Sequence, residues 1–151
     1  MKRTSGFTLI ELIVVIVILG ILAATALPKF VNIGTDARAG VIKSLEGSMR
    51  AANAMIYAKA AVNGSQASGS STIPAASVGA ASAVTIQYGY ASDATELAKV
   101  MDLTPPADFN NTGSAIQHNK AGTKANCQVA YTAAADTSTP PVYTIDITNC
   151  D

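Results

Sequence analysis

The sequence predicts an α+β fold in which one long N-terminal helix packs on a small antiparallel sheet. Three observations lead to this prediction. The chain opens with an almost uncharged apolar segment of the length of a membrane span. An amphipathic segment with the helical repeat of three and four residues comes next. Short alternating segments of the strand type, bounded by turn residues, make up the C-terminal half.

The composition indicates a single domain and argues against most enzyme classes. The chain has 151 residues, with ten Lys/Arg balanced by ten Asp/Glu, one His and two Cys. This balance provides no basic field for nucleic acid, so we expect no dedicated nucleic-acid site. No phosphate-binding loop, nucleophile elbow or zinc-protease motif is present, and His118 lies in a polar stretch where we expect a solvated loop. We therefore predict no enzyme, no catalytic residue, no metal and no cofactor.

The apolar segment Phe7–Leu27 contains one charge, Glu11. As a helix it spans roughly 30 Å, the thickness of a bilayer core. The cationic start, Lys2 and Arg3, favours a cytoplasmic N-terminus. A secretory signal peptide cut after Ala26 and a plain membrane anchor both account for the length. Neither explains Glu11, because a charge in a membrane span costs about 2.5–3.5 kcal/mol.

A third interpretation accounts for Glu11. The residues Gly6-Phe7-Thr8-Leu9-Ile10-Glu11 resemble the processing motif of type IV pilins and of the related type II secretion pseudopilins. The resemblance implies a pilin-like fold, and cleavage by a prepilin peptidase between Gly6 and Phe7. It also implies N-methylation of Phe7 as the first mature residue. Residues 1–6 are then a cytoplasmic leader, residues 7–28 a transmembrane and filament-core helix, and residues 29–151 an extracytoplasmic head that includes the second half of the helix.

Glu11 and the new N-terminus are expected to act together. In a filament core packed from such helices, the Glu11 carboxylate is a buried charge that needs a cation. The amine of Phe7, from the same or a neighbouring subunit, is the cation closest in depth. The pair is therefore expected to set the register of assembly. The resemblance further implies that the stretch between Gly20 and Pro28, residues 21–27, loses helical structure when the filament forms.

The second helical half carries one apolar stripe with spacings of three and four residues. Its members are Phe30, Ile33, Ala37, Val41, Leu45, Met49, Ala52, Ile56 and Ala60. We expect this stripe to receive the sheet. The segment 34–36 leaves open whether the helix is continuous, since it is compatible with a break or with a fresh cap.

The head is predicted to contain at least three strands and a short helix. The strand candidates are 84–90, 127–132 and 142–148, the helix is 94–101, and 63–71 is a flexible connection. Cys127 and Cys150 lie on the extracytoplasmic side, where disulfides persist, although free thiols remain the alternative. Pilins of this group commonly have a C-terminal disulfide loop, so the resemblance supports the pairing.

Within the family, the chain is most similar to the mannose-sensitive haemagglutinin pilins of Gram-negative bacteria, which are pilins of type IVa. The similarity lies in the run from Val14 to Arg38 and in the Ala-rich helix after it. This implies a major pilin that polymerises with copies of itself into a helical surface filament for adhesion or motility. The implied partners are the prepilin peptidase, the inner-membrane assembly machinery and minor pilins, with the inner membrane holding the precursor. The alternative is a type II secretion pseudopilin that acts in protein export. The expected disulfide favours the major pilin, because the resemblance implies that major pseudopilins usually lack such a bond.

Overall fold

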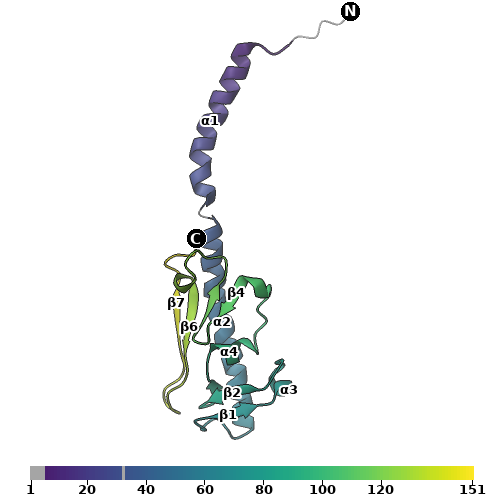
Figure 1. Ribbon diagram of the computed structural model, residues 1–151, viewed down its shortest axis with the longest axis vertical. Helices are drawn as coiled ribbons and strands as arrows, with labels where there is room; N and C mark the ends of the chain where they lie inside the picture. Colours follow the sequence, from purple (N-terminus) through teal and green to yellow (C-terminus); the bar gives the residue numbers. More distant parts are fainter. Residues whose placement is uncertain (1–5, 32) are drawn as a thin grey trace, which may run out of the picture. The chain divides into compact units, whose positions relative to one another are not determined.

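The computed structural model describes residues 6–31 and 33–151, and the side chains of residues 27–32 fall outside the description. The chain divides into two compact units that meet between Gly34 and Thr35. Each unit is described by itself. The first contains helix α1, and the second contains nearly all of helix α2 together with every strand (Figure 1).

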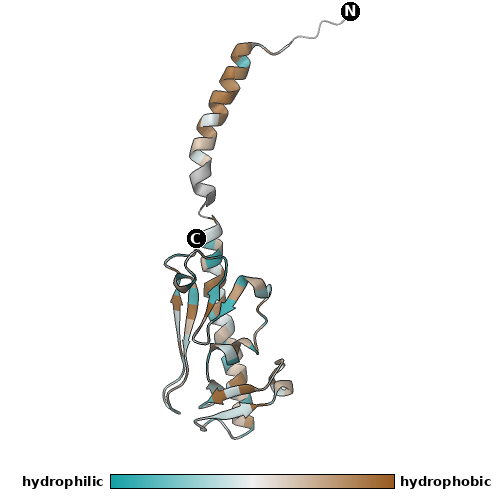
Figure 2. Ribbon diagram, in the orientation of Figure 1, coloured by the Kyte–Doolittle hydropathy of each residue, from teal (hydrophilic) through white to brown (hydrophobic). Residues whose placement is uncertain are grey.

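Helix α1, Leu9–Val31, is apolar on all its sides. Every large apolar side chain from Leu9 to Leu22 is between 45% and 75% exposed. Figure 2 shows this stretch as nearly uniformly hydrophobic. By length and composition, Leu9–Ala26 is long and apolar enough to cross a membrane.

Helix α2, Ile33–Val62, has one buried face. The predicted stripe is confirmed at Leu45, Met49, Ala52, Ile56 and Ala60, which are all buried. The N-terminal part of the predicted stripe is wrong. Ile33 is 56% exposed, Val41 is 39% exposed and Ala37 is also exposed, while Ile42 is fully buried. The buried face starts at Ile42, and Ala39 before it packs only partly against the core. The side chain of Phe30 lies outside the described residues.

The strands form two antiparallel sheets instead of the single sheet expected. The three-stranded sheet has the order β1-β2-β3, with bounds Ser71–Ile73, Val84–Gln87 and Tyr90–Ala91. The four-stranded sheet has the order β4-β5-β6-β7, with bounds Phe109–Asn111, Ala115–His118, Gln128–Thr132 and Val142–Asp146. Among the described residues, two short α-helices, α3 at Ala75–Val78 and α4 at Ala94–Ala98, and two 3-10 helices, Pro106–Asp108 and Lys124–Asn126, complete the fold.

The predicted strand 84–90 is wrong, because a turn at Tyr88-Gly89 divides it into β2 and β3. Both residues have positive φ, 49° and 85°. Gly89 also lies against α2, where an added Cβ would come within 2.8 Å of the Tyr57 ring. Only glycine combines that backbone conformation with so close an approach. Helix α4 ends at Ala98, three residues earlier than predicted, and the expected connection 63–71 runs directly into β1.

One apolar core joins α2 to both sheets. It contains Met49 and Ile56 from α2, Ile86 from β2, and Ile116 and Val129 from β5 and β6, all fully buried. The α+β fold, with a long N-terminal helical region followed by antiparallel sheet, agrees with the sequence prediction.

Candidate functional site

The start of α1 forms a reciprocal cap between Thr8 and Glu11. The amide and the hydroxyl of Thr8 both donate to Glu11 Oε2, at 2.8 Å and 2.7 Å. The amide of Glu11 donates back to Thr8 Oγ1 at 3.4 Å. This is the capping-box geometry, in which Thr and Glu three residues apart satisfy amides that a helix start leaves free. The Thr-x-x-Glu spacing is a sequence signal for this role of Thr8, which the sequence prediction missed.

The cap gives Glu11 neutral hydrogen-bond donors within its own chain. It provides no positive charge, so the carboxylate still carries its full negative charge. Phe7 follows Gly6 in this chain, so the Phe7 nitrogen is a peptide amide. It carries no positive charge and cannot be a cationic partner of Glu11. Phe7 is 88% exposed and precedes the first helical residue by two positions.

The remainder of α1 has no partner within its own unit, as far as the described residues extend. Leaving large apolar side chains in water costs about 25 cal/mol for each Å² of apolar surface. The segment from Leu9 to Leu22 therefore requires a lipid or a protein environment. Gly20 lies in open space, since a Cβ added there would have no neighbouring atom within 4 Å. The backbone is helical from Leu9 to Val31, which includes residues 21–27 and Pro28.

The two cysteines form a disulfide, as the resemblance implied. Both are fully buried, and the pair joins the start of β6 to the C-terminal segment. The Arg38 guanidinium of α2 donates to the Cys150 carbonyl, and the Gly122 amide donates to the Asp151 carbonyl at 2.7 Å. The disulfide and these two contacts hold the C-terminal segment against α2 and the β5–β6 connection.

Comparison with known proteins agrees with this geometry. The model of the prokaryotic N-terminal methylation motif matches residues 1–27. A "probable minor fimbrial protein" of Dichelobacter nodosus is 32% identical over 128 residues, which cover 80% of this chain and 79% of the relative. The chain belongs to the type IV pilin family.

Two further relatives of this pilin are similar over shorter stretches. The type IV narrow pilus major component PilA5 of Thermus thermophilus is 43% identical over 58 residues, 38% of the pilin and 50% of the relative. The type IV major fimbrial protein FimA of Dichelobacter nodosus is 46% identical over 48 residues, 32% of the pilin and 31% of the relative. The pilin thus spans only about half the length of PilA5. No protein of solved structure matches it.

Family membership makes the pilin a structural protein and not an enzyme. It implies that the chain assembles with other pilin subunits into filaments. The apolar α1 is the anchor of a membrane-bound precursor, and the extracellular pilus is the destination of the mature protein.

A buried polar cluster around Asn53 locks the head of the pilin together. Asn53 Nδ2 donates to the hydroxyls of Tyr131 and Tyr143, at 2.9 Å and 2.7 Å. Asn53 Oδ1 accepts from the Ala91 amide at 2.9 Å, and the Tyr131 hydroxyl donates to the Ala91 carbonyl at 2.7 Å. Burial raises the pKa of both phenols. The cluster connects α2 to β3, β6 and β7, and the apolar periodicity of α2 gave no sign of it.

His118 is a correction to the sequence prediction of a solvated loop. It ends strand β5, is only 5% exposed and accepts a hydrogen bond from the Lys120 amide at Nδ1. Burial lowers the pKa of His118. Its strand lies between β4 and β6, and this pairing buries a segment that looks polar in sequence. Among the described residues, no group of three His, Cys, Asp or Glu side chains is placed to hold a metal.

Proposed function

We propose that this chain is the major structural subunit of a type IV pilus, an adhesion or motility filament, similar to the mannose-sensitive haemagglutinin pilins. The observation that carries the proposal is the apolar surface of α1, exposed on all sides from Leu9 to Leu22. Such a helix is covered on all sides only when many copies pack around one another, or when lipid surrounds it. The small head, the unit Thr35–Asp151 with its disulfide, favours a repeating subunit.

Processing begins at the exposed residues before α1. A prepilin peptidase cuts between Gly6 and Phe7 and methylates the new amine of Phe7. Both residues are exposed and outside the helix, which supports access by a peptidase. The removed leader is residues 1–6, of which 1–5 lie outside the described residues. Lys2 and Arg3 keep this end in the cytoplasm of a Gram-negative host, with residues 7–28 in the inner membrane and residues 29–151 beyond it.

Cleavage creates the cation that Glu11 lacks. Before the cut, Thr8 caps Glu11 with neutral donors and orients its carboxylate. After the cut, the amine of Phe7 becomes available to Glu11 of a neighbouring subunit. In the apolar filament core, an offset that separates the two charges leaves both buried and unpaired, which is strongly unfavourable. The pair therefore selects the axial register at which each subunit joins.

The segment between Gly20 and Pro28 allows the subunit to lengthen when it loses its helical structure. Glycine is a poor helix former and proline cannot donate a helical hydrogen bond. Loss of helix over residues 21–27 changes the rise from about 1.5 Å to about 3.3 Å per residue, which lengthens the subunit by roughly 12 Å. The partners in this process are other copies of the chain, the inner-membrane assembly machinery and minor pilins.

A minor subunit is the second candidate. Two relatives that align with four fifths of this chain are both named "probable minor fimbrial protein", whereas the relatives named as major components align over only 58 and 48 residues. The abundance of the chain in the filament separates the two roles, because a major subunit repeats along the whole length.

The test compares cells with and without the gene by electron microscopy, and quantifies this chain in sheared filaments. A major subunit is the dominant protein of the filaments, and its deletion removes them. A trace amount of the chain in filaments of unchanged composition indicates the minor role instead. Loss of protein export with intact surface filaments contradicts both and identifies a pseudopilin.

A further inference from the structure

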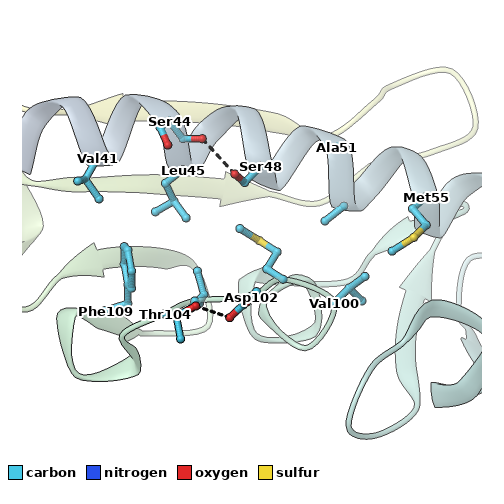
Figure 3. A pocket seen from close by; sticks show the side chains of 13 residues that line it. Val41, Ser44, Leu45, Ser48, Ala51, Met55, Val100, Asp102, Thr104 and Phe109 are labelled. Carbon is cyan, nitrogen blue, oxygen red and sulfur yellow. Dashed lines mark hydrogen bonds between the residues drawn. The ribbon is translucent and has the colours of Figure 1, made fainter.

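A groove of about 620 Å³ runs along α2 on the side that faces the connection between α4 and β4 (Figure 3). Val41, Ser48 and Met55 of α2 form one wall. The opposite wall is mainly apolar and consists of Val100, Met101, Leu103 and Phe109. One ionisable side chain, Asp102, lines it. The whole groove lies within the unit Thr35–Asp151.

The apolar side chains of this groove are left partly open to solvent. Val41 is 39% exposed and Met55 is 41% exposed. Figure 3 shows Phe109 and Leu45 on opposite sides of the gap, each pointing into it. An apolar groove of this size at the surface of a protein that polymerises indicates a contact with another molecule.

We propose that this groove takes one face of helix α1 from a second copy of the chain within the filament. The inference rests on the proposed function and names the surface of the head that takes part in it. The occupant follows from chemistry within the chain itself. Residues 12–20 of α1 precede the stretch proposed to lose helix, and they are uncharged. Their large apolar side chains from Leu12 to Leu19 are exposed and need an apolar cover. A charged or strongly polar partner would not match walls on which Asp102 is the one ionisable side chain.

The dimensions favour one face of a helix. From Val41 to Met55 the groove follows α2 for roughly 20 Å. A helix of that length and about 10 Å across occupies roughly 1,600 Å³, more than the groove holds. The groove therefore accepts a ridge of side chains, in the manner of ridges packed into grooves between helices.

The contact is also of the type that builds a filament. Helix α1 of one copy meets a different surface, the groove beside α2, on the next copy. A contact between two different surfaces repeats from copy to copy, and it generates an open helix where the rotation does not close into a ring. A self-complementary contact stops at a dimer.

Disulfide cross-linking in assembled filaments tests this contact. The two native cysteines are paired with each other, so an added cysteine is the only free thiol. Ser48→Cys places a thiol in the groove with little change of size, and Ser48 is exposed. It is combined with one cysteine at a time on α1, at positions that together cover its circumference: Ile13, Ile16, Val17, Ile18 and Leu19. The matched control is Ser138→Cys on the exposed β6–β7 connection, combined with the same α1 positions.

The expected result is a ladder of covalent oligomers for Ser48→Cys with one or two of the α1 positions and none for Ser138→Cys. Ser48→Cys alone should react with a bulky maleimide at least roughly tenfold more slowly in filaments than in detergent-dissolved subunits, a protection of about 1.4 kcal/mol. Filaments of normal yield in which Ser48→Cys forms no ladder and stays fully reactive would overturn the inference and leave the proposed function intact. Absence of filaments from the wild-type chain would overturn both.

A charge in the groove provides a second test that does not depend on cross-linking. Ala51→Glu places a carboxylate in the groove, and Ala58→Glu makes the same change two helical turns later on an exposed position outside it. We expect Ala51→Glu to lower filament yield by roughly tenfold or more relative to Ala58→Glu, with equal amounts of disulfide-bonded subunit in the membrane. Equal filament yields from the two variants would contradict the inference.

Discussion

Helices α1 and α2 are consecutive in the chain, and they differ in where their apolar side chains lie. On α1 the large apolar residues from Leu9 to Leu22 surround the helix, and all are exposed. On α2 the apolar residues form one stripe that is buried from Ile42 to Ala60 against two sheets. The comparison shows that α2 finds its apolar partners within its own unit, whereas α1 must find them in lipid or in other copies.

The difference extends to polar groups. Glu11 on α1 has neutral hydrogen-bond donors from Thr8 and no cation among the described residues of its own unit. Asn53 on α2 has partners on both its amide nitrogen and its oxygen within the head. In the proposed assembly a neighbouring subunit supplies the cation for Glu11 on α1, whereas folding of the head already supplies the hydrogen-bond partners of Asn53 on α2.

The largest effect is expected from changes at Glu11. Glu11→Ala removes both the cap and the charge, and Glu11→Gln keeps the cap, because glutamine also serves in a capping box. We expect both variants to insert into the membrane and to lower filament yield by roughly tenfold or more, because an interaction of about 1.4 kcal/mol changes an equilibrium tenfold. Sheared filaments and the membrane fraction are quantified by immunoblot. Normal filament yield from Glu11→Gln would show that the cap suffices and that the charge pair has no role.

The next effect concerns the head alone. Replacing Cys127 and Cys150 together by Ser removes the cross-link over 23 positions of sequence. The free energy of unfolding of the head should fall by about 3 kcal/mol, since the link restricts the unfolded chain. Urea unfolding of the detergent-dissolved full chain measures it, with tyrosine signals reporting on the head. If the double substitution reduced the helical content of α1 in the absence of urea, loss of the disulfide would affect more than the head, and this prediction would be contradicted.

Asn53→Ala should destabilise the head by about 2 kcal/mol, because the buried Ala91 amide loses its acceptor. The hydroxyl of Tyr131 keeps its own acceptor, the Ala91 carbonyl, so the loss is partial. Asn63→Ala, at an exposed position just after α2, is the matched control and should change the stability very little. The same urea experiment compares the two. Similar stabilities would mean that the Asn53 cluster contributes little to holding the sheets on α2.

The smallest effect is a pH dependence at His118. Burial lowers the pKa of His118, with the Asp108 carboxylate opposing the shift and Arg38 and Lys120 adding to it. The unfolded chain therefore takes up a proton near pH 6.5 that the folded head resists. The free energy of unfolding should fall as pH decreases below about 6.5, by less than in the preceding two variants. His118→Gln should flatten this dependence in thermal melts between about pH 7 and pH 5. An unchanged slope would contradict the assignment.

The carboxylates of Asp136 and Asp146 take up protons at a lower pH than His118, so they do not affect the pH dependence measured for His118. Hydrogen bonds from Ser138 and Thr139 lower the pKa of Asp136, and those from Thr148 lower the pKa of Asp146. Their contributions to stability are present above the usual Asp value of about 3.9 and are lost as the pH falls through their lowered values.

Periodicity predicted the parts of the fold where one residue pattern repeats over many positions. The apolar run of α1, most of the α2 stripe, and strands β6 and β7 were predicted in this way. The two cysteines and the resemblance together predicted the disulfide. Strands β4 and β5, with sequences Phe-Asn-Asn and Ala-Ile-Gln-His, are three and four residues long and carry no alternation that a sequence pattern detects. The two strands pair with each other as a local hairpin, and β5 also pairs with β6. Their strand conformation depends on this pairing and on packing, which their short sequences do not reveal.

Two other details were missed because they depend on contacts between segments that are distant in sequence. The turn at Gly89 is required by the approach of Tyr57 from α2, a contact that local sequence does not reveal. The burial of Asn53 depends on two tyrosines from β6 and β7 that lie 78 and 90 residues further along the chain. By contrast, the Thr8–Glu11 cap is a purely local pattern, and the sequence contained all the information needed to find it.

The central claim is that α1 remains in the mature protein and forms the shared core of the filament. The intact mass of the subunit from purified filaments tests it most directly. The account predicts the mass of the chain without Met1–Gly6 and with one added methyl group at Phe7. A mass that corresponds to loss of residues 1–26 would show that α1 is removed as a secretory signal, and this result would contradict the account.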